Sequence, residues 1–187
     1  MEFNQDTLPE EIYNKYTDIL YGFQEVFSEL DMDCDVLDDP EEVFIPAFSA
    51  LISQKEGLDY FANIVIVPYQ EEMLEENLLI QFATDLNIDV TKENKEHFRT
   101  AIETACSFAM MGNVSFVEVD KDLEHIQFKY AYPAPNMLTL PNAAVFEMFA
   151  LFIAASVFFI DVFYDLEQGN ITPEEACERL VSGDMDF

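Results

Sequence analysis

The sequence predicts an α+β protein, in which an antiparallel sheet of about four to five strands packs against helices and one long apolar helix lies near the C-terminus. Three observations indicate this class. Apolar residues recur at helical spacing before Leu30 and again after Thr91. Short runs rich in β-branched and aromatic residues lie between and after these helices. Residues 143–160 are apolar apart from Glu147 and Ser156, which indicates the long helix.

The composition limits the size of the core and the kind of partner. The chain has 187 residues, 50% of them hydrophobic, and a formal net charge of -30. We expect a single domain over 1–187, in which 1–42 form an N-terminal helix and an acidic loop and 43–187 form the sheet, a central helix and the long helix. Nucleic acid is not expected as a direct partner, because its phosphates require Lys and Arg. The charge favours a basic protein partner instead.

The N-terminal part of the chain begins with Thr7-Leu8-Pro9-Glu10, which has the S/T-x-x-E form of a capping box. The apolar positions that follow predict an amphipathic helix to about Leu30. Residues 31–42 are strongly acidic and are predicted to form a loop. The class of residues 43–55 stays open, although Pro46 argues against a central strand there.

Two strands and a helix are predicted in the middle of the chain. Residues 61–67 and 78–83 are rich in β-branched, aromatic and other apolar side chains, and an acidic connection separates them. Thr91 is the expected N-cap of the helix, and Gly112 suits its C-terminal end. The apolar positions of this helix are Phe98, Ile102, Ala105 and Ala109.

A hairpin and two helices are predicted after Gly112. Residues 114–119 and 126–132 flank a short polar turn, and the second arm alternates apolar and polar side chains as a half-buried strand does. The long helix is expected from near Pro141 to Gly169. Thr172-Pro173-Glu174-Glu175 is a second capping box with Pro at the first helical position, and it predicts a short terminal helix.

The long apolar helix is either a membrane span or part of a soluble core. Glu147 would lie in the hydrocarbon of a bilayer, and no Lys or Arg occurs between Lys129 and Arg179 to orient a span. A narrow small-or-acidic stripe also runs along the helix, and it comprises Ala143, Glu147, Ala150, Ala154, Asp161 and Asp165. We therefore interpret the helix as one that lies across the sheet of a soluble protein, with its stripe turned to water or to a close neighbour. A homodimer through the stripe stays open.

The sequence contains one weak candidate for a metal site. Within the acidic segment, Asp31, Asp33, Asp35 and Glu42 have the ligand spacing of an EF-hand calcium loop. Val36 occupies the place where that loop needs Gly, so an acidic turn is the simpler reading. The three cysteines, Cys34, Cys106 and Cys177, are too scattered for a disulfide framework. The N-terminus has no signal for secretion, so we expect a cytoplasmic protein.

No pattern in the sequence indicates catalysis. His97 and His125 are the only histidines, they lie far from each other in the sequence, and each is interpreted as a solvated side chain. No glycine-rich phosphate loop, nucleophile elbow or metalloprotease motif is present. We therefore expect neither enzyme activity nor a cofactor.

Three stretches of the chain resemble the YbjN-like proteins, which are also known as sensory-transduction regulators and share the fold of type III secretion chaperones. The stretches are E-H-F-R-T-A-I-E-T-A-C-S-F-A-M-M-G-N-V-S-F-V-E-V-D, H-I-Q-F-K-Y-A-Y-P and V-F-F-I-D-V-F-Y-D-L-E-Q-G-N-I-T-P-E-E-A. The resemblance covers roughly residues 60–180. It implies a small acidic domain, often dimeric, that binds another polypeptide and performs no chemistry.

Two functions are consistent with the sequence. The first is a non-enzymatic, chaperone-like or regulatory domain that recognises another polypeptide through an apolar surface on the sheet or beside the long helix. The alternative is an acidic decoy or immunity-type inhibitor, which covers a basic nucleic-acid-binding surface by imitating phosphates. Carboxylates arranged along one face with phosphate-like spacing would distinguish the alternative.

Overall fold

The computed structural model describes residues 8–39, 41, 43–67, 77–108, 112–135 and 143–183 of the chain. The chain divides into two compact units, each built from three segments. The first unit comprises Met1–Leu51, Asn63–Phe82 and Ala131–Met148, and the second comprises Ile52–Ala62, Ala83–Tyr130 and Phe149–Phe187. The expectation of a single domain stays a prediction.

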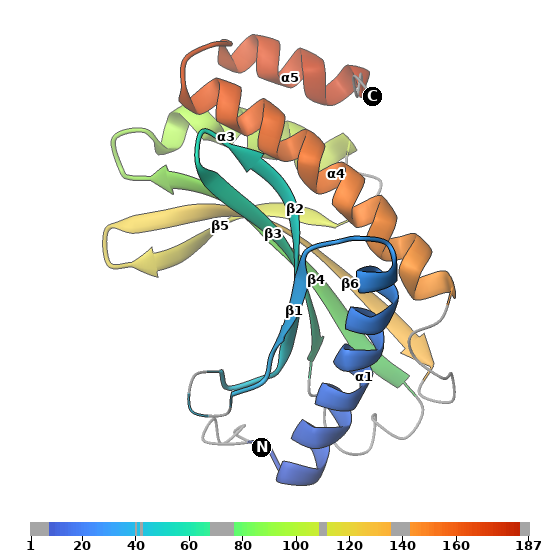
Figure 1. Ribbon diagram of the computed structural model, residues 1–187. Helices are drawn as coiled ribbons and strands as arrows, with labels where there is room; N and C mark the ends of the chain where they lie inside the picture. The colour runs from blue at the N-terminus through green and yellow to red at the C-terminus, as the bar shows by residue number, and fades with distance from the viewer. Residues whose placement is uncertain are drawn as a thin grey trace. The chain divides into compact units, whose positions relative to one another are not determined.

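The described helices and strands confirm the predicted α+β class. Their bounds are α1 (Glu10–Glu29), β1 (Cys34–Leu37), β2 (Ala47–Lys55), β3 (Leu58–Val67), β4 (Asn77–Val90), α3 (Lys95–Phe108), β5 (Asn113–Asp120), β6 (Leu123–Pro135), α4 (Ala143–Glu167) and α5 (Pro173–Ser182). The strands form one antiparallel, six-stranded sheet in the order β1-β2-β3-β4-β6-β5 (Figure 1). The sheet therefore has slightly more strands than the sequence predicts.

In the first unit, α1 packs through one apolar side. Tyr16, Leu20, Phe23 and Phe27 are buried, and they lie on one side because they recur every three or four residues. The ring of Phe27 lies 5.4 Å from that of Phe48 and 5.2 Å from that of Phe146, centroid to centroid. The helix begins at Glu10, and its N-cap residue Pro9 makes no side-chain capping bond. Thr7 of the predicted capping box lies outside the described residues.

The acidic segment after α1 corrects one prediction. A loop over 31–42 is wrong for Cys34–Leu37, which form β1 and pair antiparallel with β2. Val36 lies opposite Phe48 and is buried, so one apolar contact and a ladder of backbone hydrogen bonds outweigh the low strand propensity of the aspartates. β2 begins at Ala47, directly after Pro46, and the proline therefore interrupts no ladder bond.

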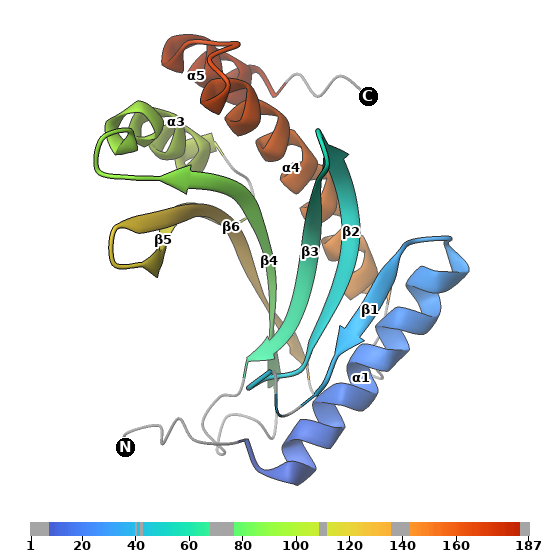
Figure 2. The ribbon, with the colours of Figure 1, turned by 60° about the vertical axis from the view of Figure 1, so that its left-hand side comes forward.

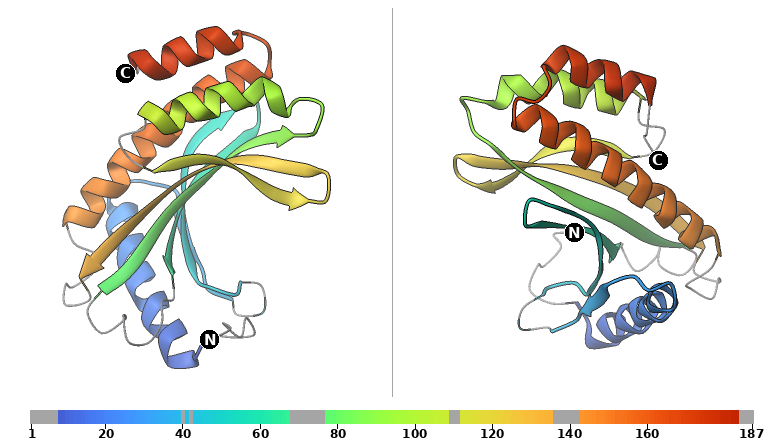
Figure 3. Two further views of the ribbon diagram at one scale, coloured as in Figure 1. Left: turned by 180° about the vertical axis from the view of Figure 1, so that it is seen from behind. Right: turned by 45° about the horizontal axis from the view of Figure 1, so that its top comes forward.

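In the second unit, the predicted hairpin and central helix are confirmed. β5 and β6 pair antiparallel, with Val114 opposite Phe128 and Val117 opposite His125. α3 begins four residues after Thr91, whose carbonyl oxygen accepts a hydrogen bond from the backbone nitrogen of Lys95. Ala109, predicted on the apolar side of this helix, lies outside the described residues. α3 and α5 lie side by side (Figure 3).

The second unit also contains the longest departure from the predicted strands. β4 extends to Val90, past the predicted end at residue 83, because burial continues at every second residue. One of these buried residues is Thr84, whose hydroxyl oxygen lies 3.1 Å from that of Ser156 on α4. Both side chains are fully buried, and Ser156 also donates to the carbonyl oxygen of Phe152. The ring of Phe152 in turn stacks on Phe128 at 4.7 Å between centroids.

Candidate interaction surface

The side of α4 that faces away from the core forms the main candidate surface, and we call it the α4 outer face. Positions spaced by three, four or seven residues lie on one side of a helix. The α4 outer face consists of Ala143, Glu147, Ala150, Leu151, Ala154 and Phe158, of which the first four are exposed and the last two half-buried. All six belong to one continuous helix, so their spacing follows from helix geometry.

Much of α4 is apolar without being buried. By length and composition alone this helix qualifies as a membrane span, yet only 33% of its most apolar 18-residue window is buried. Leu151 has 55% of its surface exposed. The opposite side packs inward through residues such as Phe152, Ser156 and Phe163. The α4 outer face is therefore apolar surface that the described chain leaves uncovered.

The charges along α4 differ in whether they are paired. Asp161 forms an ion pair with Lys55 at 2.5 Å, and Asp165 forms one with Arg179 at 2.8 Å. Burial raises the pKa of Asp165, but its hydrogen bonds to Asn170 and Arg179 and the positive charge of Arg179 outweigh burial, so the pKa lies below its ordinary value. Within the described part of the chain, no basic residue pairs with Glu147. Glu147 is thus the uncompensated charge of the α4 outer face.

The predicted site residues fall into two groups. Ala143, Glu147, Ala150 and Ala154 share the α4 outer face, whereas Asp161 pairs within the chain. Asp31 and Asp33 precede β1, Asp35 lies within it, and Glu42 lies outside the described residues. Strand β1 therefore occupies positions that an EF-hand would need for its calcium-binding loop. In the described ranges, no three His, Cys, Asp or Glu side chains are placed to hold a metal ion.

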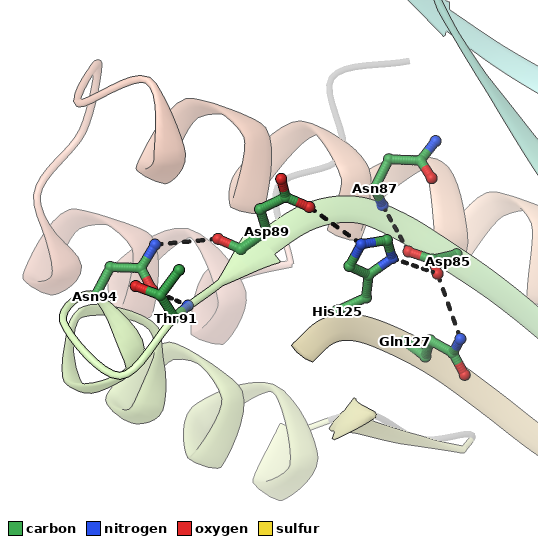
Figure 4. Close-up of polar contacts among 7 residues, drawn as sticks. All are labelled: Asp85, Asn87, Asp89, Thr91, Asn94, His125 and Gln127. Atoms are coloured by element: carbon green, nitrogen blue, oxygen red, sulfur yellow. Dashed lines mark hydrogen bonds and ion pairs between the residues drawn. The ribbon is translucent and has the colours of Figure 1, made fainter. Parts of the chain in front are cut away.

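A second polar arrangement lies on β4 and β6 of the second unit. Figure 4 shows His125 between Asp85 and Asp89. Its Nδ1 lies 2.9 Å from Asp85 Oδ2, and its Nε2 lies 3.1 Å from Asp89 Oδ1. Gln127 also donates to Asp85, at 3.3 Å. The predicted polar side of this strand is confirmed, but His125 is not a solvated side chain, because only 21% of the side chain is exposed and both ring nitrogens are engaged.

The geometry favours the doubly protonated ring of His125. Carboxylate oxygens only accept hydrogen bonds, so the ring donates to both aspartates only when each nitrogen carries a proton. Burial lowers the pKa of His125, but hydrogen bonds to Asp85 and Asp89 and their negative charges outweigh burial, and the pKa lies above its ordinary value of 6.5. A doubly protonated ring has no lone pair that could accept a proton or bind a metal. The arrangement is therefore an ion pair that ties β6 to β4.

Carboxylates in the first unit form a third feature, which we call the α1–β1 acidic strip. The segment that follows α1 runs back along the helix (Figure 2): Gln24 donates to Asp35 at 3.2 Å and Tyr21 donates to Asp38 at 2.9 Å. The exposed carboxylates of the strip are Glu10, Glu11, Asp18, Glu25, Glu29, Asp31, Asp33, Asp35 and Asp39. Lys15 is the one basic residue before Lys55, so the strip is strongly negative.

Sequence reasoning missed the His125 ion pairs for a specific reason. The predicted strand ends at residue 83, so Asp85 and Asp89 are not expected on a strand at all. The signal that could have found them is the continued alternation of Leu86, Ile88 and Val90, which places the residues between them on the opposite face. An extended β4 would then have set two aspartates on one polar face.

The fold and these surfaces define an acidic α+β protein with an incompletely covered apolar helix. Comparison of the chain with protein-family models, with curated proteins and with solved structures found no match. The resemblance to the YbjN-like proteins therefore stays a prediction.

Proposed function

We propose that this protein is a non-enzymatic, cytoplasmic, chaperone-like or regulatory domain, which binds another polypeptide through the α4 outer face. The observation that supports the proposal is that this predominantly apolar helix has only 33% of its most apolar window buried. A helix of that kind is normally surrounded by protein or lipid. Exposed apolar surface of this kind marks a site of interaction.

The polar groups of the second unit also support a role in binding over a role in catalysis. General acid–base catalysis needs a group that is free to contact a substrate. His125 is held between Asp85 and Asp89 with both nitrogens occupied. This geometry suits a structural role, in which His125 links β6 to β4 within the sheet.

A crosslinking experiment tests the proposal directly. A photoreactive amino acid replaces Leu151, and in a matched control it replaces Val181 on α5, whose exposed fraction of 51% is close to the 55% of Leu151. After irradiation in native lysate, we expect one discrete adduct from position 151 and none from position 181. The adduct partner, once purified, should bind the unmodified protein and lose binding to the Leu151→Asp variant. Identical adducts from both positions would argue against the α4 outer face.

The α1–β1 acidic strip favours a second candidate function, the acidic decoy. The twenty residues of α1 span about 30 Å. Five of the nine exposed carboxylates lie on α1, about one every 6 Å along the helix, and the other four lie on the segment that returns beside it. Two such neighbouring rows of negative charge resemble the charged backbone of a nucleic acid. A basic nucleic-acid-binding surface is the partner that such a strip would fit.

Competition with nucleic acid tests this second candidate. The purified protein is added to a complex of a basic DNA-binding domain with labelled single-stranded DNA, and DNA release is measured at rising salt. A decoy should release DNA in a strongly salt-dependent way. Replacing Asp18, Glu25 and Asp35 by the matching amides should weaken release, whereas amides at Glu174 and Glu178 on α5 should not. If the variant of the strip and the variant of α5 release DNA equally well, the release depends only on net charge and the acidic strip is not a decoy surface.

A further inference from the structure

The α4 outer face itself carries information about what covers it, and the inference drawn from it rests on the proposed function. We propose that the docking segment is a basic amphipathic helix of another protein, which places a Lys or Arg next to Glu147. Three properties of the molecule support this proposal: the shape of the surface, its unpaired carboxylate and the net charge of the chain.

The shape of the surface favours a helix. Ala150 and Ala154 are one turn apart, and their small side chains let a second helix approach closely. An extended segment pressed on this apolar surface would leave its backbone N–H and C=O groups without partners, because α4 has used its own within the helix. A helix satisfies its backbone groups internally. The occupant is therefore helical where it contacts α4.

The unpaired carboxylate requires a cation from the occupant. Glu147 is exposed, and within the described residues it has no basic partner, whereas Asp161 and Asp165 are already paired with Lys55 and Arg179. A helix that covers Ala150 and Leu151 removes water from the neighbouring Glu147. Burying one charge alone is costly, and a Lys or Arg on the occupant removes that cost. The chain's net charge of -30 also steers a basic partner toward the surface.

A second copy of this chain does not fit the α4 outer face. No Lys or Arg occurs between Lys129 and Arg179, so the α4 of a second copy cannot supply the cation that Glu147 needs. Association would also bring together two chains that each carry a net charge of -30. An anionic membrane surface is repelled for the same reason.

Binding of synthetic peptides to the full-length protein tests the inference. The probe is a labelled peptide of about 18 residues built from Leu, Ala and Lys, with its apolar residues at helical spacing. One control peptide has the same composition in an order that destroys the apolar face, and another has Gln in place of Lys. We expect the basic amphipathic peptide to bind at least about tenfold more tightly than either control, as measured by fluorescence anisotropy.

Three variants separate the inference from the proposed function. Leu151→Asp should abolish binding of the amphipathic peptides, and Glu147→Gln should weaken the basic peptide about five- to tenfold without affecting the Gln peptide. Glu178→Gln, an exposed carboxylate on α5, is the matched control and should change nothing. Circular dichroism confirms that each variant is folded; since all three positions are exposed, their melting temperatures should match the wild type.

If Leu151→Asp abolishes binding but Glu147→Gln does not weaken it, the inference fails and the proposed function stands. If Leu151→Asp has no effect on any peptide, the α4 outer face is not the docking site and both fail. Sedimentation that shows a dimer broken by Leu151→Asp would assign the surface to a second copy. Binding to zwitterionic vesicles that Leu151→Asp abolishes would assign it to lipid.

Discussion

The buried hydroxyl pair of Thr84 and Ser156 allows a quantitative test of how β4 and α4 are held together in the second unit. Their oxygens lie 3.1 Å apart, both side chains are fully buried, and Ser156 has a second partner in the Phe152 carbonyl oxygen. Ser156→Ala leaves the Thr84 hydroxyl buried without that partner, which costs about 1–3 kcal/mol. Thr84→Val leaves Ser156 bonded to Phe152, so its cost should be about 1 kcal/mol or less.

The double variant should cost less than the sum of the two single variants. Once both hydroxyls are gone, no buried donor is left unpaired, and we expect a coupling free energy of about 1 kcal/mol. Urea unfolding followed by circular dichroism measures each value, with tyrosine fluorescence as a second probe because the chain has 8 Tyr and no Trp. At a urea dependence of about 2 kcal/mol per molar, a loss of 2 kcal/mol lowers the midpoint by about 1 M.

Ser107 on α3 provides the matched control for Ser156. Ser107 makes the same hydrogen bond to the carbonyl oxygen four residues earlier, but it is exposed. Ser107→Ala should therefore change the free energy of unfolding by no more than about 0.5 kcal/mol. Single effects of Thr84→Val and Ser156→Ala that add to within about 0.3 kcal/mol would show that the two hydroxyls do not stabilise each other.

Three further predictions concern single residues of the second unit. The pKa of His125 is raised, so the ion pair stabilises fully below the unfolded pKa of about 6.5 and is lost as the pH rises through the folded value. The difference in free energy of unfolding between wild type and His125→Gln should shrink as the pH rises above about 6.5 and through the raised folded pKa, and a constant difference would contradict this reasoning. Gly112→Ala should abolish or severely reduce folding, as measured by circular dichroism, because its Cβ would lie 2.3 Å from the Lys129 carbonyl oxygen at a φ of +77°. Thr172→Ala removes the hydroxyl that accepts from Glu175 N in the capping box of α5 and should cost about 1 kcal/mol in urea unfolding; no loss would mean that the box is not formed in solution.

The sequence predicts those elements of the fold whose patterns are local. Helix α1, the β5–β6 hairpin, the long α4 and the capped α5 follow from helical spacing, alternation and capping residues, all of which act within a few positions. Strand β1 could not be predicted in this way, because Cys34–Leu37 become a strand only when Val36 is buried against β2. The sequence analysis ends β4 too early, although the alternation of Leu86, Ile88 and Val90 continues past residue 83 and is itself a local signal.

The candidate site was predictable in position but not in detail. Helical spacing alone places Ala143, Glu147, Ala150 and Ala154 on one side of α4. Which of its carboxylates are neutralised depends on residues far away in the sequence. Lys55 reaches Asp161 from β2 and Arg179 reaches Asp165 from α5, and only this tertiary pairing singles out Glu147 as the unpaired charge.

The position of α4 late in the chain has a consequence for how the protein is made. In the second unit, buried side chains of the sheet such as Phe128 contact Phe152 and Phe159, which are synthesised after the strands. At about 5–20 residues per second, the segment from residue 136 to residue 183 takes several seconds to appear. During that time the apolar side chains of the sheet are exposed, because α4 has not yet been synthesised, and such exposed surface is prone to aggregation. Residues 1–135 already contain 29 Asp or Glu and 7 Lys or Arg, a formal net charge of -22, and charge of this size makes unfinished copies repel one another.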